Sequence, residues 1–210
     1  MLGTARAWVE GWAAARLMPE PVEVPWGLRI DIGRPDQMVR HVLLDADPGA
    51  ARELIASVTE PTTCVKAFLP GAEMRPWFSS GWEPVESCFL MAVDLRPARV
   101  HVPDGYRVTV EAAGDMTCVR VLDADGRVAA SGRTGRAGSA RAFDQIVTEP
   151  AHQRRGLGTV VMGTLTEAAL DEGARTGVLG ATDQGRALYE ALDWKVLAPL
   201  DGFAYRPVAR

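Results

Sequence analysis

Apolar residues recur at helical spacing within the first 17 positions of the chain. Trp8, Trp12 and Ala15 fall on one face of a helix, because residues three and four apart lie side by side on its surface. The segment also carries Glu10, and its apolar run is too short for a signal-peptide core or a membrane span. We therefore predict an amphipathic helix that buries its tryptophan face.

Between positions 28 and 95, apolar runs typical of strands alternate with helical patterns. Asp47 and Pro48 form a helix start, since aspartate is favoured as N-cap and proline in the first turn. The predicted strands are 28–32, 38–45, 63–69 and 83–95, and the predicted helices are 48–58 and 71–79.

The segment 96–105 divides the chain, because it holds two prolines and a Pro-Asp-Gly turn signal. Beyond it, Asp125 and Gly126 give a hairpin signal between two apolar runs. The predicted strands are 106–111, 117–122, 127–132, 141–148, 176–181 and stretches within 195–207, and the predicted helices are 156–172 and 183–192. The pattern indicates an α/β protein.

The two parts of the chain resemble each other. Strand, helix, strand, helix and long strand follow in this order at 38–95 and again at 141–207. The ends of the second helices read WFSSGW and YEALDW, which sets Trp82 against Trp194 and Trp77 against Tyr189. We predict two similar halves, 1–98 and 103–210, and coincidence between two generic segments is the alternative.

The stretch 143–158, FDQIVTEPAHQRRGLG, joins a strand to a helix through a glycine-rich turn. The first N–H groups of a helix have no partner inside it and attract anions. Gly156 and Gly158 allow a phosphate to approach the main chain, and Arg154 and Arg155 add positive charge. A Rossmann or P-loop pattern does not fit the spacing. An ordinary glycine-rich turn is the remaining alternative, and the first half has no such loop.

The spacing Gln153-x-x-Gly156-x-Gly158 is similar to the pyrophosphate loop of the GCN5-related N-acetyltransferases (GNAT). Pro150 before the loop and the pair Leu188-Tyr189 on the later helix also resemble this family. The resemblance covers roughly residues 105–207. It implies a GNAT-like mixed, mostly antiparallel sheet with flanking helices.

In that family the acyl donor is acetyl-CoA, and no metal is implied. The resemblance implies that the loop holds the pyrophosphate and that the pantetheine arm pairs with the end of the preceding strand. The residues implied are Ile146, Val147, Thr148, Gln153, Arg154, Arg155, Gly156, Leu157, Gly158 and Thr159, together with Thr182, which stands where the family often has Asn.

Tyr189 is the candidate general acid, because the resembling family uses this tyrosine to protonate the thiolate leaving group. A locally satisfied core tyrosine is the alternative. For the general base we select Glu149 beside the loop, with Asp144, Glu83 or a chain of waters as alternatives. Simple alternation along the strand places Asp144 and Glu149 on opposite faces.

The sequence departs from the family pattern in three further places. Gly185 stands where an alanine is common, and Asp193-Trp194 stands where the family usually has Gly-Phe. Only 112–116 separates the first two strands of the second half, where the family has two helices. We expect the first half to cover the face of the sheet left open there.

Charge and cysteine content restrict the partners. The net charge of −4 favours neither nucleic acid nor an anionic membrane, and it suits a cationic amine. Cys64, Cys88 and Cys118 do not have the spacing of a metal site or of a disulfide framework, which indicates a reduced, cytoplasmic protein. The three histidines do not have the spacing of metal ligands either.

Two basic features near the loop stay open at this point. Arg133, Arg136 and Arg141 lie among glycines and either contact the adenosine 3′-phosphate or belong to a mobile hairpin or bulged loop. His152 either approaches a phosphate or is a solvated residue of the turn.

The sequence thus predicts a monomeric or homodimeric N-acetyltransferase that transfers acetyl from acetyl-CoA to a primary amine of a small molecule by direct attack. The alternatives are a longer acyl-CoA, a carrier-bound acyl group, or a non-catalytic CoA-binding module. The acceptor cannot be read from residues 1–100, which carry no ligand motif.

Overall fold

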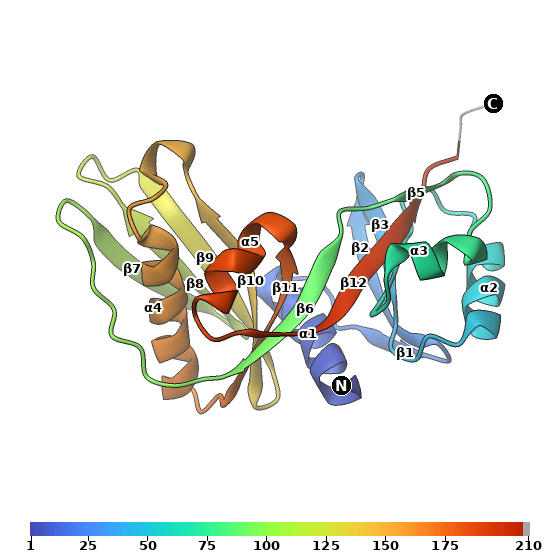
Figure 1. Ribbon diagram of the computed structural model, residues 1–210, viewed down its shortest axis with the longest axis horizontal. Coiled ribbons are helices and arrows are strands. Elements are labelled where there is room, and N and C mark those ends of the chain that lie inside the picture. Colours follow the sequence, from blue (N-terminus) through green and yellow to red (C-terminus); the bar gives the residue numbers. More distant parts are fainter. Residues whose placement is uncertain (208–210) are drawn as a thin grey trace.

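The computed structural model describes residues 1–207. Its strands join into one open, mostly antiparallel sheet in the order β1-β2-β3-β4-β12-β6-β11-β10-β9-β8-β7, and β5 pairs with β12 beside this path (Figure 1). The strands are β1 (Val22–Val24), β2 (Gly27–Arg34), β3 (Gln37–Leu43), β4 (Cys64–Ala67), β5 (Trp82–Pro84), β6 (Cys88–Asp94), β7 (Arg107–Ala113), β8 (Met116–Leu122), β9 (Val128–Ala137), β10 (Ala140–Thr148), β11 (Thr176–Thr182) and β12 (Lys195–Tyr205). The helices are α1 (Leu2–Ala15), α2 (Pro48–Ser57), α3 (Gly71–Met74), α4 (Leu157–Asp171) and α5 (Asp183–Glu190), with 3₁₀ turns η1 (Arg75–Trp77) and η2 (Pro150–His152). Within this part of the chain, every helix is too short or too polar to span a bilayer.

Helix α1 covers the face of the sheet opposite α4. Its residues Trp8, Trp12 and Ala15 are buried as the sequence predicts, and α1 packs on β9, β10 and β11. Helix α4 packs on β8, β9 and β10 from the other side (Figure 1). The helix that replaces the two missing family helices therefore comes from the N-terminal half, as expected.

Two predicted strands differ from the observed ones. The predicted strand 83–95 is divided into β5 and β6, which pair with different parts of β12. Strand β9 continues past the predicted end at 132 to Ala137, through Gly132 and Gly135. These glycines serve packing: a Cβ at Gly132 would press on Val161 of α4, and one at Gly135 would meet the backbone of α1.

We expect Gly135→Ala to destabilise the protein by about 2–3 kcal/mol, since the added methyl overpacks the α1–β9 contact against backbone that cannot turn away. Urea or thermal unfolding measures the loss. Gly3→Ala in the open first turn of α1, where a Cβ meets nothing within 4 Å, is the matched control. Equal stability of the two variants would contradict the close packing.

The halves exchange their last strands. Strand β6, from the N-terminal half, pairs with β11 of the C-terminal half through the register Thr176↔Asp94 to Thr182↔Cys88. In return β12 pairs with β4 through Asp201↔Ala67 to Ala204↔Cys64. Since β6 and β12 also pair with each other, one continuous sheet joins the halves, and both parts depend on strands from the other.

The order of elements is similar on both sides of this junction. Strands β3 and β4 pair in parallel and are connected along the chain through α2, and strands β10 and β11 pair in parallel and are connected through α4. Gly81 before Trp82 and Asp193 before Trp194 both have left-handed φ, at 88° and 65°. We propose on this basis that the halves are duplicated copies.

Helix α2, in the N-terminal half, differs from α4 at its start. The Asp47 carboxylate accepts a hydrogen bond from the Ala50 N–H at 2.7 Å, so an anion from the chain itself occupies this helix end. We propose that the N-terminal half binds no cofactor for this reason.

His41 makes stability depend on pH. Burial and the nearby Arg29 lower its pKa to about 4, against the smaller effect of Asp31, and its Nδ1 accepts a hydrogen bond from Trp26 Nε1 at 3.2 Å. Because the unfolded histidine titrates near 6.5, the unfolded state binds more protons between these values, and stability falls as pH drops from 6.5 toward 4. Thermal midpoints of the wild type and His41→Gln across this range should converge at the acid end; a constant difference would contradict the prediction.

Candidate active site

The turn before α4 presents main-chain N–H groups to the outside. Arg154 and Gly156 have φ of 62° and 78°, which turns the chain sharply into the helix at Leu157. Within residues 1–207 no side chain caps this helix, and a Cβ at Gly156 would meet nothing within 4 Å. The first-turn N–H groups, through Thr159, are therefore free for an anion. A pyrophosphate fits this turn, which the helix dipole and two arginines favour electrostatically.

Arg155 of the turn is held by a hydrogen-bonded pair, Tyr106 and His152. Arg155 Nη1 donates to the Tyr106 hydroxyl at 2.9 Å, and that oxygen lies 2.9 Å from His152 Nδ1. His152 Nε2 is 3.7 Å from the Asp123 carboxylate. His152 is thus a half-buried structural partner of the turn rather than a fully solvated residue. Nothing in the sequence pairs Tyr106 with a residue 46 positions away.

Strands β10 and β11 separate beside the turn. Their parallel pairing runs from Ala140↔Thr176 to Phe143↔Leu179 and then ends. Strand β11 continues along β6 to Thr182, whereas β10 bulges at Gln145, whose φ is 53°. The facing main-chain edges of the two strands are therefore open. The predicted pantetheine residues Ile146, Val147 and Thr148 lie on this open part of β10.

The bulge corrects the predicted orientation of the strand-end carboxylates. Asp144 pairs with Arg133 and Val147 with Ser131, so that residues three apart share one face of β10. Simple alternation, which separated Asp144 from Glu149, fails because the extra residue reverses the pattern beyond it.

A cavity of about 460 Å³ opens where β10 and β11 diverge. Its wall includes Asp144, Ile146, Gly180 and Thr182 from the two strands and Tyr189 from α5. The N-terminal half supplies the opposite side through α1, β3 and β4, with Trp8, Trp12, Arg16, Asp36, Gln37, Arg40, Thr62, Cys64, Lys66, Val85, Glu86 and Cys88. The cavity is therefore shared by both halves, and its size suits a small molecule.

Tyr189 is buried to 9% exposure in this wall. Burial, with a smaller contribution from Asp144, raises its pKa to about 12, so the phenol stays protonated at neutral pH. Trp194 packs beside it, with ring centroids 6.1 Å apart. A Cβ at Gly185 would lie 3.2 Å from its ring, which explains glycine at a position where alanine is common.

Comparison with known proteins now identifies the fold. The family model described as Acetyltransferase (GNAT) family matches residues 81–194, more than half of the chain. The chain belongs to the GNAT family. No curated protein matches the sequence.

Solved structures share this GNAT fold. A GCN5-related N-acetyltransferase from Kribbella flavida is 16% identical, with 99% of this chain and 95% of that chain covered and a TM-score of 0.69. A protein of the GNAT family from Novosphingobium aromaticivorans is 14% identical, with 98% of this chain and 99% of that chain covered and a TM-score of 0.65. A tandem GNAT protein from the clavulanic acid biosynthesis pathway is 13% identical, with 76% and 69% covered and a TM-score of 0.57.

Membership defines the general chemistry. The protein is an N-acetyltransferase, and GNAT enzymes transfer an acyl group, using acetyl-CoA as substrate, to amines of small molecules or proteins. No group of three or more His, Cys, Asp or Glu side chains that could hold a metal ion is found among residues 1–207.

The Asp193-Trp194 departure from the GNAT pattern has a conformational basis. Helix α5 ends with Trp194 N–H bonded to Tyr189 C=O at 3.1 Å, while Asp193 takes φ of 65°. This is a left-handed C-terminal cap that favours glycine, and the buried Trp194 packs back on Tyr189.

We expect Asp193→Gly to stabilise the protein by about 1 kcal/mol, since glycine adopts the left-handed conformation without the steric cost of a Cβ. Chemical denaturation measures the gain. Asp183→Gly, in the first turn of α5 with ordinary helical geometry, is the control and should destabilise. A loss of stability in Asp193→Gly would contradict the assignment of this cap.

Thr182 has a structural contact of its own. Its hydroxyl accepts a hydrogen bond from Gly185 N at 3.2 Å and so caps α5, which carries Tyr189. Thr182 also lines the cavity, so its predicted place at the cofactor stays a proposal.

The candidate bases are not equally placed. Glu149 is exposed and is not among the residues that line the cavity with Tyr189. Glu83 is also exposed, 3.8 Å from Arg206. Asp144 lines the cavity, but Arg16 binds both its oxygens, at 2.6 and 3.1 Å. The structure therefore brings no unpaired carboxylate of the three to Tyr189.

The basic residues of β9 and β10 are distant from the turn. Arg136 and Arg141 both pair with Glu172, just beyond the C-terminal end of α4, whereas the turn lies at its N-terminal end. The interpretation that they contact the adenosine 3′-phosphate is wrong for these two arginines. The stretch forms a hairpin, in which β9 and β10 pair antiparallel from Ala137↔Ala140.

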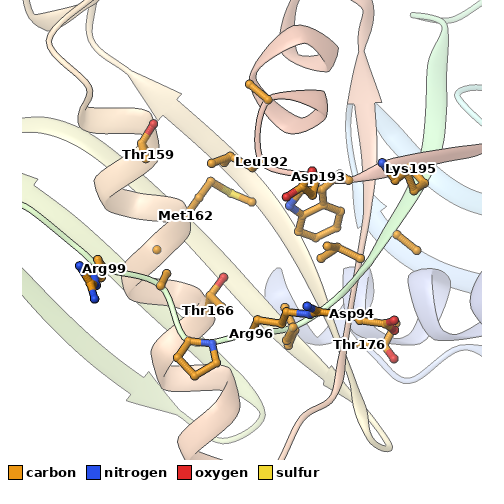
Figure 2. A pocket seen from close by; sticks show the side chains of 18 of the residues that line it. Asp94, Arg96, Arg99, Thr159, Met162, Thr166, Thr176, Leu192, Asp193 and Lys195 are labelled. Atoms are coloured by element: carbon orange, nitrogen blue, oxygen red, sulfur yellow. The ribbon is translucent and has the colours of Figure 1, made fainter.

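A second, larger cavity of about 780 Å³ lies beyond the turn (Figure 2). Figure 2 shows Thr159, Met162 and Thr166 of α4 on one side, with Leu192 and Asp193 across from them. It adjoins the turn through Thr159 but contains neither Tyr189 nor the gap between β10 and β11. The smaller cavity is therefore the candidate site of acyl transfer.

Proposed function

We propose that the protein transfers an acetyl group from acetyl-CoA to the primary amine of a small molecule by direct attack. One observation carries this proposal. The separated edges of β10 and β11 and the buried Tyr189 meet at the cavity of 460 Å³, and the open turn at the start of α4 follows directly on the freed end of β10.

The chain supplies separate groups for the parts of the donor. The N–H groups from Arg154 to Thr159, with Gln153 before them, would hold the pyrophosphate. The open edge from Ile146 to Thr148 would hold the pantetheine arm and direct the thioester between the strands. The donor then approaches from the α4 face, and the acceptor lies on the α1 face, in the cavity that the N-terminal half closes.

Tyr189 acts as general acid in this proposal. Direct attack forms the amide C–N bond and breaks the thioester C–S bond, and the phenol gives its proton to the leaving sulfur. Its pKa of about 12 keeps the proton on the phenol at working pH, and its place in the cavity wall supports the role. Since Asp144 is bound by Arg16 and Glu149 lies outside the cavity, we propose that water carries the proton away from the amine in place of Glu149.

A panel of small amines with acetyl-CoA, read out by thiol release and mass analysis of products, tests the function. Propionyl-CoA and longer acyl-CoA measured in parallel test the acyl preference. We expect turnover with at least one small primary amine and fastest release from acetyl-CoA. Bound CoA without acylation of any amine would contradict the proposal and favour a non-catalytic CoA-binding module.

A further inference from the structure

Two cationic side chains in the acceptor cavity have no anionic partner among residues 1–207. They are Arg40 of β3 and Lys66 of β4. The register pairs Arg40 with Cys64 and Val42 with Lys66, so both project from the same face of neighbouring strands. This face lies toward α1 and the cavity.

The Arg40 guanidinium is held but only partly satisfied. It stacks on Trp12, with Cζ 3.9 Å from the centroid of the indole ring, and Nη2 donates to Gln37 Oε1 at 2.9 Å. Its Nε is buried and has no hydrogen-bond partner within the described chain. The side chain is therefore oriented, yet donor capacity is left over.

Lys66 is more deeply buried, with 7% exposure. Its Nζ donates to the Leu200 carbonyl at 3.3 Å, which leaves two of its three donors without a partner in the described residues. Burial lowers the pKa of both cations, with Arg40 adding to the effect on Lys66.

Among the described residues, no carboxylate of the cavity forms an ion pair with Arg40 or Lys66. Asp144 is engaged by Arg16, whereas Asp36 and Glu86 are exposed. A buried charge without a partner is costly, and a protein tolerates it where a ligand supplies the missing charge. The local excess of positive charge runs against the overall charge of −4.

We propose that the acceptor is a small amine that also bears a carboxylate, as an amino acid does, and that Arg40 and Lys66 bind this carboxylate. The inference rests on the proposed acyl transfer and names its substrate class. The amine lies toward Tyr189 and the carboxylate toward β3 and β4. Polyamines and other polycationic acceptors are disfavoured, because they would add positive charge to a positive cavity.

Matched acceptors test the proposal. Free amino acids and their primary amides share the same amine, so only the carboxylate differs. We expect kcat/KM about 10- to 100-fold higher for the acids, as for hydrogen bonds to charged groups. Equal rates for acids and amides, or a preference for polyamines, would overturn the inference while the acetyltransferase function stands.

Variants assign the preference to the two cations. Arg40→Met and Lys66→Met should each reduce the acid-to-amide ratio toward one, whereas Arg52→Met on the exposed surface of α2 should leave it unchanged. Thermal unfolding separates a binding role from a structural one. If the cation is kept for a ligand, its removal should not lower the thermal unfolding midpoint. A marked fall of the midpoint in both variants, with an unchanged acid-to-amide ratio of kcat/KM, would overturn the proposal.

A binding measurement keeps the two proposals apart. Calorimetry with N-acetylated amino acids and their amides reports on the cavity without any acyl transfer. Tighter binding of the acids, lost in Lys66→Met, supports the inference even if no amine is acetylated, which would count against the proposed function alone. Equal binding of acids and amides overturns the inference.

Discussion

Replacing Tyr189 with Phe should lower kcat by about 10²- to 10⁴-fold, the usual contribution of a general acid. The phenyl ring keeps its packing against Trp194, so the fold should be retained. Only the hydroxyl proton for the leaving sulfur is lost. Steady-state kinetics with acetyl-CoA, together with CoA affinity by calorimetry, measures the effect, and the affinity should not change.

Tyr205→Phe on β12 is the matched control, because this tyrosine packs against Trp82 in the core of the N-terminal half. Its kcat should equal that of the wild type. Since the pKa of Tyr189 is raised to about 12, the pH profile should also show no fall from loss of its proton up to about pH 10. Unimpaired turnover in Tyr189→Phe would refute the acid role.

Separate expression of 1–98 and 103–210 should give two chains that do not fold. The fragment 103–210 lacks β6, which lies between β11 and β12, so the main-chain groups of both strands that pair with β6 are exposed. The fragment 1–98 in turn loses the strand that pairs with β4 and β5. Circular dichroism and thermal scans should show no cooperative transition for either, whereas the co-expressed fragments should assemble.

The control is the full chain cleaved after folding between positions 98 and 103, which should stay associated and stable. A cooperative unfolding transition of isolated 103–210, with CoA binding intact, would show that the exchanged strands are dispensable. That result would also remove the reason to regard the cavity as shared by both halves.

The sequence was informative where the chemistry is local. The open turn from Gln153 to Thr159, the proposed anion site, follows from a few adjacent residues, because main-chain N–H groups and glycine conformations form it. The α1 helix was predicted from the spacing of its tryptophans. Family membership likewise agrees with the resemblance drawn from the loop and Leu188-Tyr189.

The cavity could not be predicted, because its parts come together only through pairing of distant strands. Arg16 and Asp144 are 128 positions apart, and nothing in either segment indicates the other. The bulge at Gln145 is equally invisible to alternation, so the alternating pattern assumed along β10 fails beyond Asp144. Glycines such as Gly135 in β9 suggested a loop because the close helix that requires them lies far away in sequence.

Binding of CoA at the turn from Arg154 to Thr159 is the central claim, and calorimetry on the wild type and Gly156→Leu tests it most directly. A leucine at Gly156 places a side chain in the open space before α4, whereas Gly138→Leu adds the same residue at another open position with left-handed φ. We predict saturable binding by the wild type and Gly138→Leu and a loss of about tenfold or more in Gly156→Leu. No binding by the wild type, or equal affinity in all three proteins, would contradict the account.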